Sequence, residues 1–168
     1  MAPATPSPKQ QFLDSYEHEH ARTMKLLRAF PADKTDLKPH ARLRSARELA
    51  WVFVMERGLG TQVMSGQFGS APPSAPPPAP AWKETLAGLE KAHKEFGDMI
   101  REMPDTKLQE PVKFLTGPKQ MSDMPRMQFL WFMLSDQIHH RGQLSVYLRL
   151  ADGKVPSIYG PSGDEPWM

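Results

Sequence analysis

Two side chains that can bind a divalent cation, Asp136 and His140, stand four residues apart near the C-terminal end of the chain. They interrupt a row of apolar residues at helical spacing, so both should project from one face of one helix, a turn apart. A carboxylate that faces a core is costly unless it is paired or bound to a metal. A carboxylate and an imidazole in this arrangement can hold one divalent ion. Alternatively, Asp136 accepts a hydrogen bond from His140 and no metal is involved.

Other polar residues fall on the expected inner faces of the remaining helices. Glu56 is the next candidate ligand. Its carboxylate could instead pair with one of three arginines: Arg44, Arg47 and Arg141. His20 and His93 each stand alone on an apolar face, which is more typical of a core histidine than of a ligand, and His20 ranks after Glu56 as a candidate. His139 lies about 100° round the helix from His140, so we expect it outside the site.

The composition excludes several kinds of chemistry. The 168 residues include no cysteine, which rules out disulfides, thiolate metal sites and cysteine nucleophiles. The segments GLGTQ and GQFGS lack the lysine and the preceding strand of a phosphate-binding loop, and no HExxH motif or nucleophile elbow occurs. A net charge of +2 indicates no nucleic-acid-binding surface.

The apolar segments give an expectation about location. No apolar run approaches the ~20 residues that a membrane span requires. The N-terminal segment MAPATPSPKQQ has no cationic region followed by an apolar one, so it does not read as a signal peptide. We therefore expect a cytoplasmic protein that does not bind a membrane.

The 18 prolines divide the chain into four blocks that are each long enough for a helix. Apolar residues recur at helical spacing in every block and almost no alternating pattern occurs. This predicts an all-α protein, a four-helix bundle with long, proline-rich connections. The second block begins with a capping-box signal, Ser45 followed by Glu48, and the fourth should begin near Ser122 or Asp123, either of which is a good N-cap. The blocks cover approximately residues 9–30, 45–64, 82–103 and 122–151.

A chain of this length predicts one domain. Residues 1–8 should form a disordered N-terminal arm and residues 9–168 the bundle. A proline-rich insert at about 67–81 should be a spacer or a ligand for a partner domain. Residues 104–122 should form a long connection in which PVKFL could be a short extended piece. The C-terminal tail KVPSIYGPSGDEPWM keeps several apolar side chains, so we expect it to fold back on the bundle.

The segment DQIHHRGQLSVYLRLADGKVPSIYG (residues 136–160) resembles the C-terminal signature of the DinB/YfiT-like family. The shared pattern is a metal-ligand position, three residues, a histidine, Arg-Gly-Gln and a later Pro-x-x-Tyr-Gly. The upstream segment RSARELAWVFVMER is similar to that family's second helix. The resemblance covers most of the chain, with the insert at 67–81 atypical. It implies a four-helix bundle that is often dimeric, so we expect a homodimer that binds a small-molecule ligand.

The resemblance also implies a three-residue centre for a divalent metal, zinc or nickel, with one histidine from the second helix and two ligands from the last. His140 matches the last ligand, and Asp136 stands where most members have histidine and some have glutamate. Val52 falls where the second-helix histidine should be, and valine cannot bind a metal. Glu56, one turn further along that face, could substitute in a rearranged pocket. The expected site is therefore Glu56, Asp136 and His140, with a departure from the family pattern.

Characterised relatives in this family are S-transferases and isomerases that use low-molecular-weight thiols. The resemblance therefore implies a divalent-metal-dependent thiol S-transferase or isomerase with a degenerate metal site. The alternative is a metal-free bundle that binds a small molecule or a protein without catalysis. Val52 favours the alternative, and the retained pair of Asp136 and His140 favours the enzyme. A third possibility is that the proline-rich insert recruits a partner to the bundle.

Overall fold

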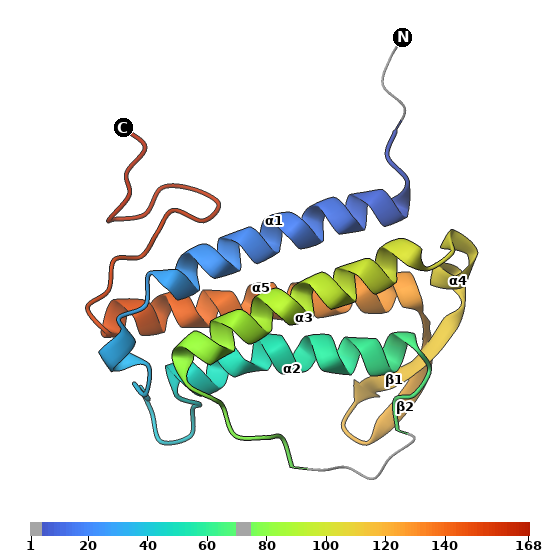
Figure 1. Ribbon diagram of the computed structural model, residues 1–168, viewed down its shortest axis with the longest axis horizontal. Helices are drawn as coiled ribbons and strands as arrows, with labels where there is room; N and C mark the ends of the chain where they lie inside the picture. Colours follow the sequence, from blue (N-terminus) through green and yellow to red (C-terminus); the bar gives the residue numbers. More distant parts are fainter. Residues whose placement is uncertain (1–4, 70–74) are drawn as a thin grey trace.

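A computed structural model of the chain describes residues 5–69 and 75–168. Within these residues four long helices run along the length of the molecule, and a short helix and a two-stranded hairpin lie at one end (Figure 1). The predicted helical bundle is thus confirmed. No helix in the described ranges is long and apolar enough to cross a membrane. The elements in chain order are α1 (Pro8–Arg28), η1 (Ala32–Lys34), α2 (Ala46–Met64), α3 (Trp82–Glu102), α4 (Asp105–Gln109), β1 (Pro111–Gly117), β2 (Gln120–Pro125) and α5 (Arg126–Leu150).

The long helices do not follow a simple up-and-down order. Both α1 and α2 pack on α3 and α5, so α1 and α2 lie diagonally across the bundle although they are consecutive. Trp51 of α2 lies near Gly88 of α3. Towards the C-terminal ends of both helices, Gly60 of α2 lies against Phe96 of α3. These contacts show that α2 and α3 are parallel (Figure 1). The chain must therefore return along a helix length of about 30 Å, and the proline-rich connection is that return path.

The first helix begins slightly earlier than predicted. α1 starts at Pro8, and the Ser7 hydroxyl caps it by accepting a hydrogen bond from the backbone N–H of Gln10 at 3.2 Å. Residues 1–4 of the predicted disordered arm and residues 70–74 of the predicted insert lie outside the described residues.

The starts of α2 and α5 contrast. The predicted capping box is confirmed: the Glu48 N–H donates to Ser45 Oγ, and the Ser45 N–H donates to the Glu48 carboxylate at 2.7 Å. The predicted start of the last helix near Ser122 or Asp123 is wrong, because both residues lie in β2. α5 begins at Arg126, whose N–H donates at 3.1 Å to the main-chain carbonyl that precedes β1.

The predicted connection at residues 104–122 contains α4 and most of an antiparallel hairpin. PVKFL is extended within β1, as expected, but its pairing with β2 was not predicted. Val112 and Phe114 are buried between exposed neighbours, and the Phe114 ring lies 4.9 Å from that of Phe129 on α5. This apolar contact holds the hairpin against the bundle, so the residues of β2 pair as a strand and are not available to start a helix.

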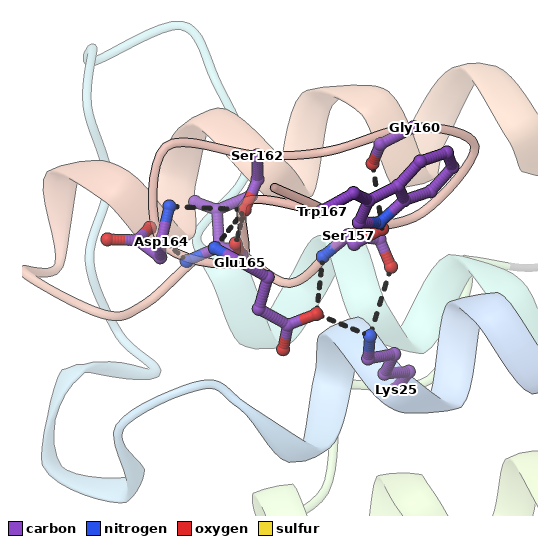
Figure 2. Close-up of polar contacts among 8 residues, drawn as sticks. Lys25, Ser157, Gly160, Ser162, Asp164, Glu165 and Trp167 are labelled. Carbon is purple, nitrogen blue, oxygen red and sulfur yellow. Dashed lines mark hydrogen bonds and ion pairs between the residues drawn. The ribbon is translucent and has the colours of Figure 1, made fainter.

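The C-terminal tail folds back over α1 and α5, as expected (Figure 2). Lys25 of α1 donates to the Ser157 carbonyl at 3.1 Å and pairs with Glu165 at 2.7 Å. The same glutamate accepts a hydrogen bond from the Ser157 N–H at 2.9 Å. Asp164 forms an ion pair with Arg149 of α5. The tail is therefore fastened to two helices by ion pairs and hydrogen bonds.

The apolar core consists of two clusters separated by a polar layer. The cluster near the hairpin includes Phe12, Val63, Phe96 and Phe129, and the other includes Leu27, Phe53, Leu89 and Leu144. Along each long helix, polar residues fall between the two clusters. Among them are His20, Glu56, Arg57, His93, Gln137, His140 and Arg141. The middle of the bundle is therefore where its chemistry is concentrated.

Candidate metal centre

Glu56, Asp136 and His140 meet between α2 and α5. His140 Nε2 lies 3.3 Å from Glu56 Oε1 and 3.6 Å from Asp136 Oδ2. One donor atom from each residue lies within 4.8 Å of the other two. The side chains of Glu56 and His140 are 11% and 15% exposed, whereas that of Asp136 is 44% exposed. The structure therefore brings the three predicted residues together, two of them largely buried and Asp136 at the rim.

The electrostatics of this group suit a cation. Burial raises the pKa of Glu56, against the lowering effect of the hydrogen bond from His140. The same hydrogen bond raises the pKa of His140, since the carboxylate stabilises the imidazolium. Glu56 Oε2 is buried and accepts no hydrogen bond from any described residue. A buried carboxylate oxygen without a partner is costly, and coordination by a cation would remove that cost.

Neighbouring residues set the orientation of His140. Its Nδ1 lies 3.2 Å from Gln143 Oε1, so an Nδ1–H can donate there and leave Nε2 facing the carboxylates. His139 is exposed and contacts the Gln143 amide at 3.0 Å, outside the group, as predicted. Val52 is 7% exposed and belongs to the same apolar cluster as Leu144. At the position where the family resemblance requires a histidine ligand, this chain thus has a valine that packs in the apolar core.

The other pairing considered for Glu56 does not occur. Arg47 pairs with an aspartate of the preceding connection at 2.7 Å, and Arg141 pairs with a glutamate of α1 at 2.6 Å. The side chain of Arg44 forms no ion pair with any described residue. His140 is therefore the basic side chain that contacts Glu56.

His20 and His93 lie apart from this group. Their rings stack at 3.7 Å between centroids, with an angle of 7° between planes. His93 Nε2 lies 2.8 Å from Glu17. Burial, with a smaller effect of the neighbouring His93, lowers the pKa of His20 to about 3. His93 is buried and His20 is half-buried, so the two lie in the core and at its boundary, and the structure does not bring His20 to the candidate centre.

Arg141 bridges to the C-terminal tail, a role that its position on the last helix allowed, and it also pairs with α1. Its side chain is 3% exposed and pairs with Glu19 of α1 at 2.6 Å. It also donates to the hydroxyl of Tyr159 in the tail, and that hydroxyl donates to Glu19 at 2.6 Å. The arginine of the Arg-Gly-Gln segment and the tyrosine of the Tyr-Gly segment thus contact each other, although they are far apart in sequence.

Sequence reasoning also missed a cavity of about 690 Å³ beside His140. Residues of α2 and α5 line it, together with the connection before α2 and residues 76–79 of the proline-rich connection. The only signal in the sequence was the unusual length of these two connections. The length of the two connections did not indicate that they lie close to each other, or that both lie close to the last helix.

Comparison with known proteins gives the family. The sequence matches the DinB family over residues 3–167. It is 30% identical over 156 residues to the uncharacterized protein YrdA of Bacillus subtilis (strain 168), a match that covers 92% of this chain and 89% of that protein. The fold is similar to the crystal structure of a DinB-like protein from Bacillus cereus ATCC 10987, with a TM-score of 0.73, 25% identity and coverage of 88% of this chain and 95% of that one. It is also similar to the DinB-like protein YjoA of Bacillus subtilis, with a TM-score of 0.68, 16% identity and coverage of 88% and 97%. The chain therefore belongs to the DinB family.

Proposed function

We propose that Glu56, Asp136 and His140 bind one divalent metal ion, zinc or nickel, and that the protein is a metal-dependent thiol S-transferase or isomerase. The supporting observation is that two carboxylates and an imidazole place donor atoms within 4.8 Å of one another. Two rigid helices supply them, and one buried oxygen of Glu56 lacks a partner. The family resemblance supplies the reaction class.

The donor set fits a metal that also binds a substrate. Three protein ligands leave at least one coordination position open, which is the pattern of catalytic zinc sites. A divalent ion bound here would lower the pKa of a coordinated thiol, and so would supply a thiolate nucleophile. Gln143 would hold the His140 ring in place from behind. Glu56 Oε2 is available to accept the thiol proton if this residue does not bind the metal through both oxygens.

The alternative is a metal-free bundle that binds a small molecule without catalysis. One observation favours it: His140 already pairs with both carboxylates, at 3.3 Å and 3.6 Å. A protonated imidazole between two carboxylates compensates their charge without a metal. The apolar packing of Val52 points in the same direction.

Metal analysis of protein purified without an affinity tag tests the proposal. We expect one equivalent of zinc or nickel in the wild type. Asp136→Ala and His140→Ala should each weaken binding by at least about 10- to 100-fold, the range for removal of an outer-sphere partner, because removal of a ligand should cost no less. His139→Ala is the matched control, since this neighbouring imidazole is exposed and outside the group. It should retain the metal.

The opposite result is equally clear. A metal-free wild type whose thermal stability does not change on addition of chelator, zinc or nickel contradicts the metal site and leaves the binding function. Glu56→Gln locates the third ligand: it removes the charge at nearly constant volume, so metal affinity should fall while the fold is retained. Unchanged affinity in this variant would show that the metal, if bound, is held without Glu56.

A further inference from the structure

The cavity beside His140 has the dimensions of a ligand site. Its volume of about 690 Å³ lies within the range of about 300–1,000 Å³ typical of small-molecule pockets. Leu49 and Met55 of α2 and Tyr147 of α5 contribute to its lining, and the rest comes from the two connections that flank α2. His140 belongs both to this lining and to the candidate metal centre. A molecule in the cavity would therefore reach that centre.

The lining is unevenly charged. Lys38, Arg42 and Arg44 contribute cationic side chains, and none of these side chains forms a hydrogen bond or an ion pair with a described residue, although the charges of Lys38 and Arg44 help to lower the pKa of Glu48. Among the described residues of the lining, Glu48 supplies the opposing carboxylate, but it already accepts the Ser45 N–H at 2.7 Å in the capping box. Unpaired cations around a concave surface raise the local concentration of anions and favour their binding.

The connection before α2, which carries Lys38, Arg42 and Arg44, is held at a definite distance from His140. The Tyr147 hydroxyl donates to the Arg44 carbonyl at 3.1 Å and so fastens the connection to α5. Tyr147 follows His140 by seven residues, which is about 10 Å along a helix. A ligand about 10 Å long could place a charged group at Arg44 while its other end lies at His140.

The proline-rich segment supplies the apolar side of the cavity. Pro76, Pro77, Pro78 and Ala79 line it, and we refer to residues 76–79 as the proline wall. Proline has a fixed φ and no N–H, so consecutive prolines form a stiff apolar surface that loses little conformational entropy when a ligand binds.

We propose that this cavity binds an organic anion. Its carboxylate, sulfonate or phosphate group lies at Lys38, Arg42 and Arg44, and its apolar part lies against the proline wall. The proposal deepens the proposed function, on which its catalytic meaning rests, because it gives the chemical class of the co-substrate at the same site. Anion binding itself does not require the metal, so the two can be tested separately.

A pair of fluorescent probes tests the charge requirement. One probe is 8-anilinonaphthalene-1-sulfonate, and the other is N-phenyl-1-naphthylamine, which has the same aromatic body without the sulfonate. Both are titrated into full-length protein that has been stripped of metal by a chelator and then desalted. We expect one sulfonate probe per chain. Arg42→Ala and Arg44→Ala should each weaken it about tenfold, the scale of one charge-assisted hydrogen bond, and change the neutral probe less than about twofold.

The controls make the result specific. Lys107→Ala removes the same charge from α4, whose residues do not line the cavity, and should change neither probe. Arg42→Lys should retain most of the sulfonate affinity. The proposal is overturned if both arginine variants bind the sulfonate probe like wild type, or if both probes lose affinity equally. The probes are titrated into metal-stripped protein, so anion binding is measured separately from metal binding. A protein that binds the anion but no metal would refute only the proposed enzyme. Metal binding without anion binding would refute only this proposal.

The proline wall has its own test. Substitution of Pro76, Pro77 and Pro78 by glycine should weaken both probes, by about fivefold, because a flexible segment must be ordered when the ligand binds. The α-helical signal in circular dichroism should be unchanged, since this segment contains no helix. Equal affinity in the variant and the wild type would show that the proline wall does not contact the ligand.

Discussion

His20 and His93 stack in the middle of the bundle, with His93 buried and His20 half-buried. Burial is the main reason why the pKa of His20 falls from 6.5 to about 3. The unfolded chain binds a proton on this residue below pH 6.5, and the folded chain does not until about pH 3. The unfolded state therefore binds more protons in this window, so stability falls as the pH falls.

This linkage can be measured with His20→Leu. Between pH 6.5 and pH 5, the shift would remove about 1.6 kcal/mol of unfolding free energy if it acted in full, and partial exposure of the His20 ring lowers the expected loss to about 1 kcal/mol. The variant should show a correspondingly flatter dependence in urea denaturation. His18→Leu, at an exposed position of the same helix, should keep the wild-type slope. Identical slopes for wild type and His20→Leu would contradict the pKa given for this residue.

How far residues could be predicted depended on the kind of information needed. Helical spacing was sufficient to place Glu56, Asp136 and His140 on inner faces, and the structure brings these residues together. Spacing could not show that Arg141 would pair with Glu19, nor that His20 would stack on His93. Those outcomes depend on which helices are neighbours, and one sequence does not contain that information directly.

At the scale of elements, α2 contacts α3 closely at one glycine. A Cβ on Gly60 would lie 2.8 Å from Phe96 Cζ and 3.1 Å from Met133 Sδ. Gly58, on the same helix, has no atom within 4 Å of such a Cβ. Helix propensity alone treats both glycines as weakening the helix to the same extent. The contacts show that they have different consequences.

We predict opposite effects for the two alanine variants. Gly60→Ala should lower the free energy of unfolding by about 1–3 kcal/mol, because overpacking outweighs the gain in helix propensity. Gly58→Ala should raise it by up to about 1 kcal/mol, because alanine favours the helix and meets no clash. Urea denaturation of both variants checks the pair. A stabilising Gly60→Ala would mean that Phe96 moves aside without cost.

Helices and the hairpin differed in how well they could be predicted. Each long helix has a local signal, such as the capping box of Ser45 and Glu48, and their cores were predicted closely. The hairpin depends on partners from a separate segment, with Val112 opposite Met124. Ser122 and Asp123 have the side chains of good N-caps, but their backbone pairs with β1 instead. A local rule could not resolve this competition.

At the scale of the whole molecule, one buried ion pair joins three distant segments. Glu19 of α1, Arg141 of α5 and Tyr159 of the tail contact one another. The hydrogen bonds from Tyr159 and Arg141 lower the pKa of Glu19, against the raising effect of burial, which is the largest single influence. Since Arg141 is 3% exposed, its charge has little access to water if the partner is lost.

Glu19→Gln should therefore be strongly destabilising. We expect a loss of about 3 kcal/mol in unfolding free energy at pH 7, the lower end for breaking a buried pair by removing one partner. Glu95→Gln, which disrupts an exposed pair with Lys91 at 3.8 Å, should cost less than about 0.5 kcal/mol. Equal effects in the two variants would show that the buried pair does not stabilise the fold.

The parallel arrangement of α2 and α3 also divides the molecule in an unexpected way. A chain cut within the connection between them would give two pieces, one with α1 and α2 and the other with α3, the hairpin and α5. Glu56 would belong to the first piece, and Asp136 and His140 to the second. The three donors would then come together only when the halves reassociate. Metal binding by these residues would therefore report that the split protein has reassembled.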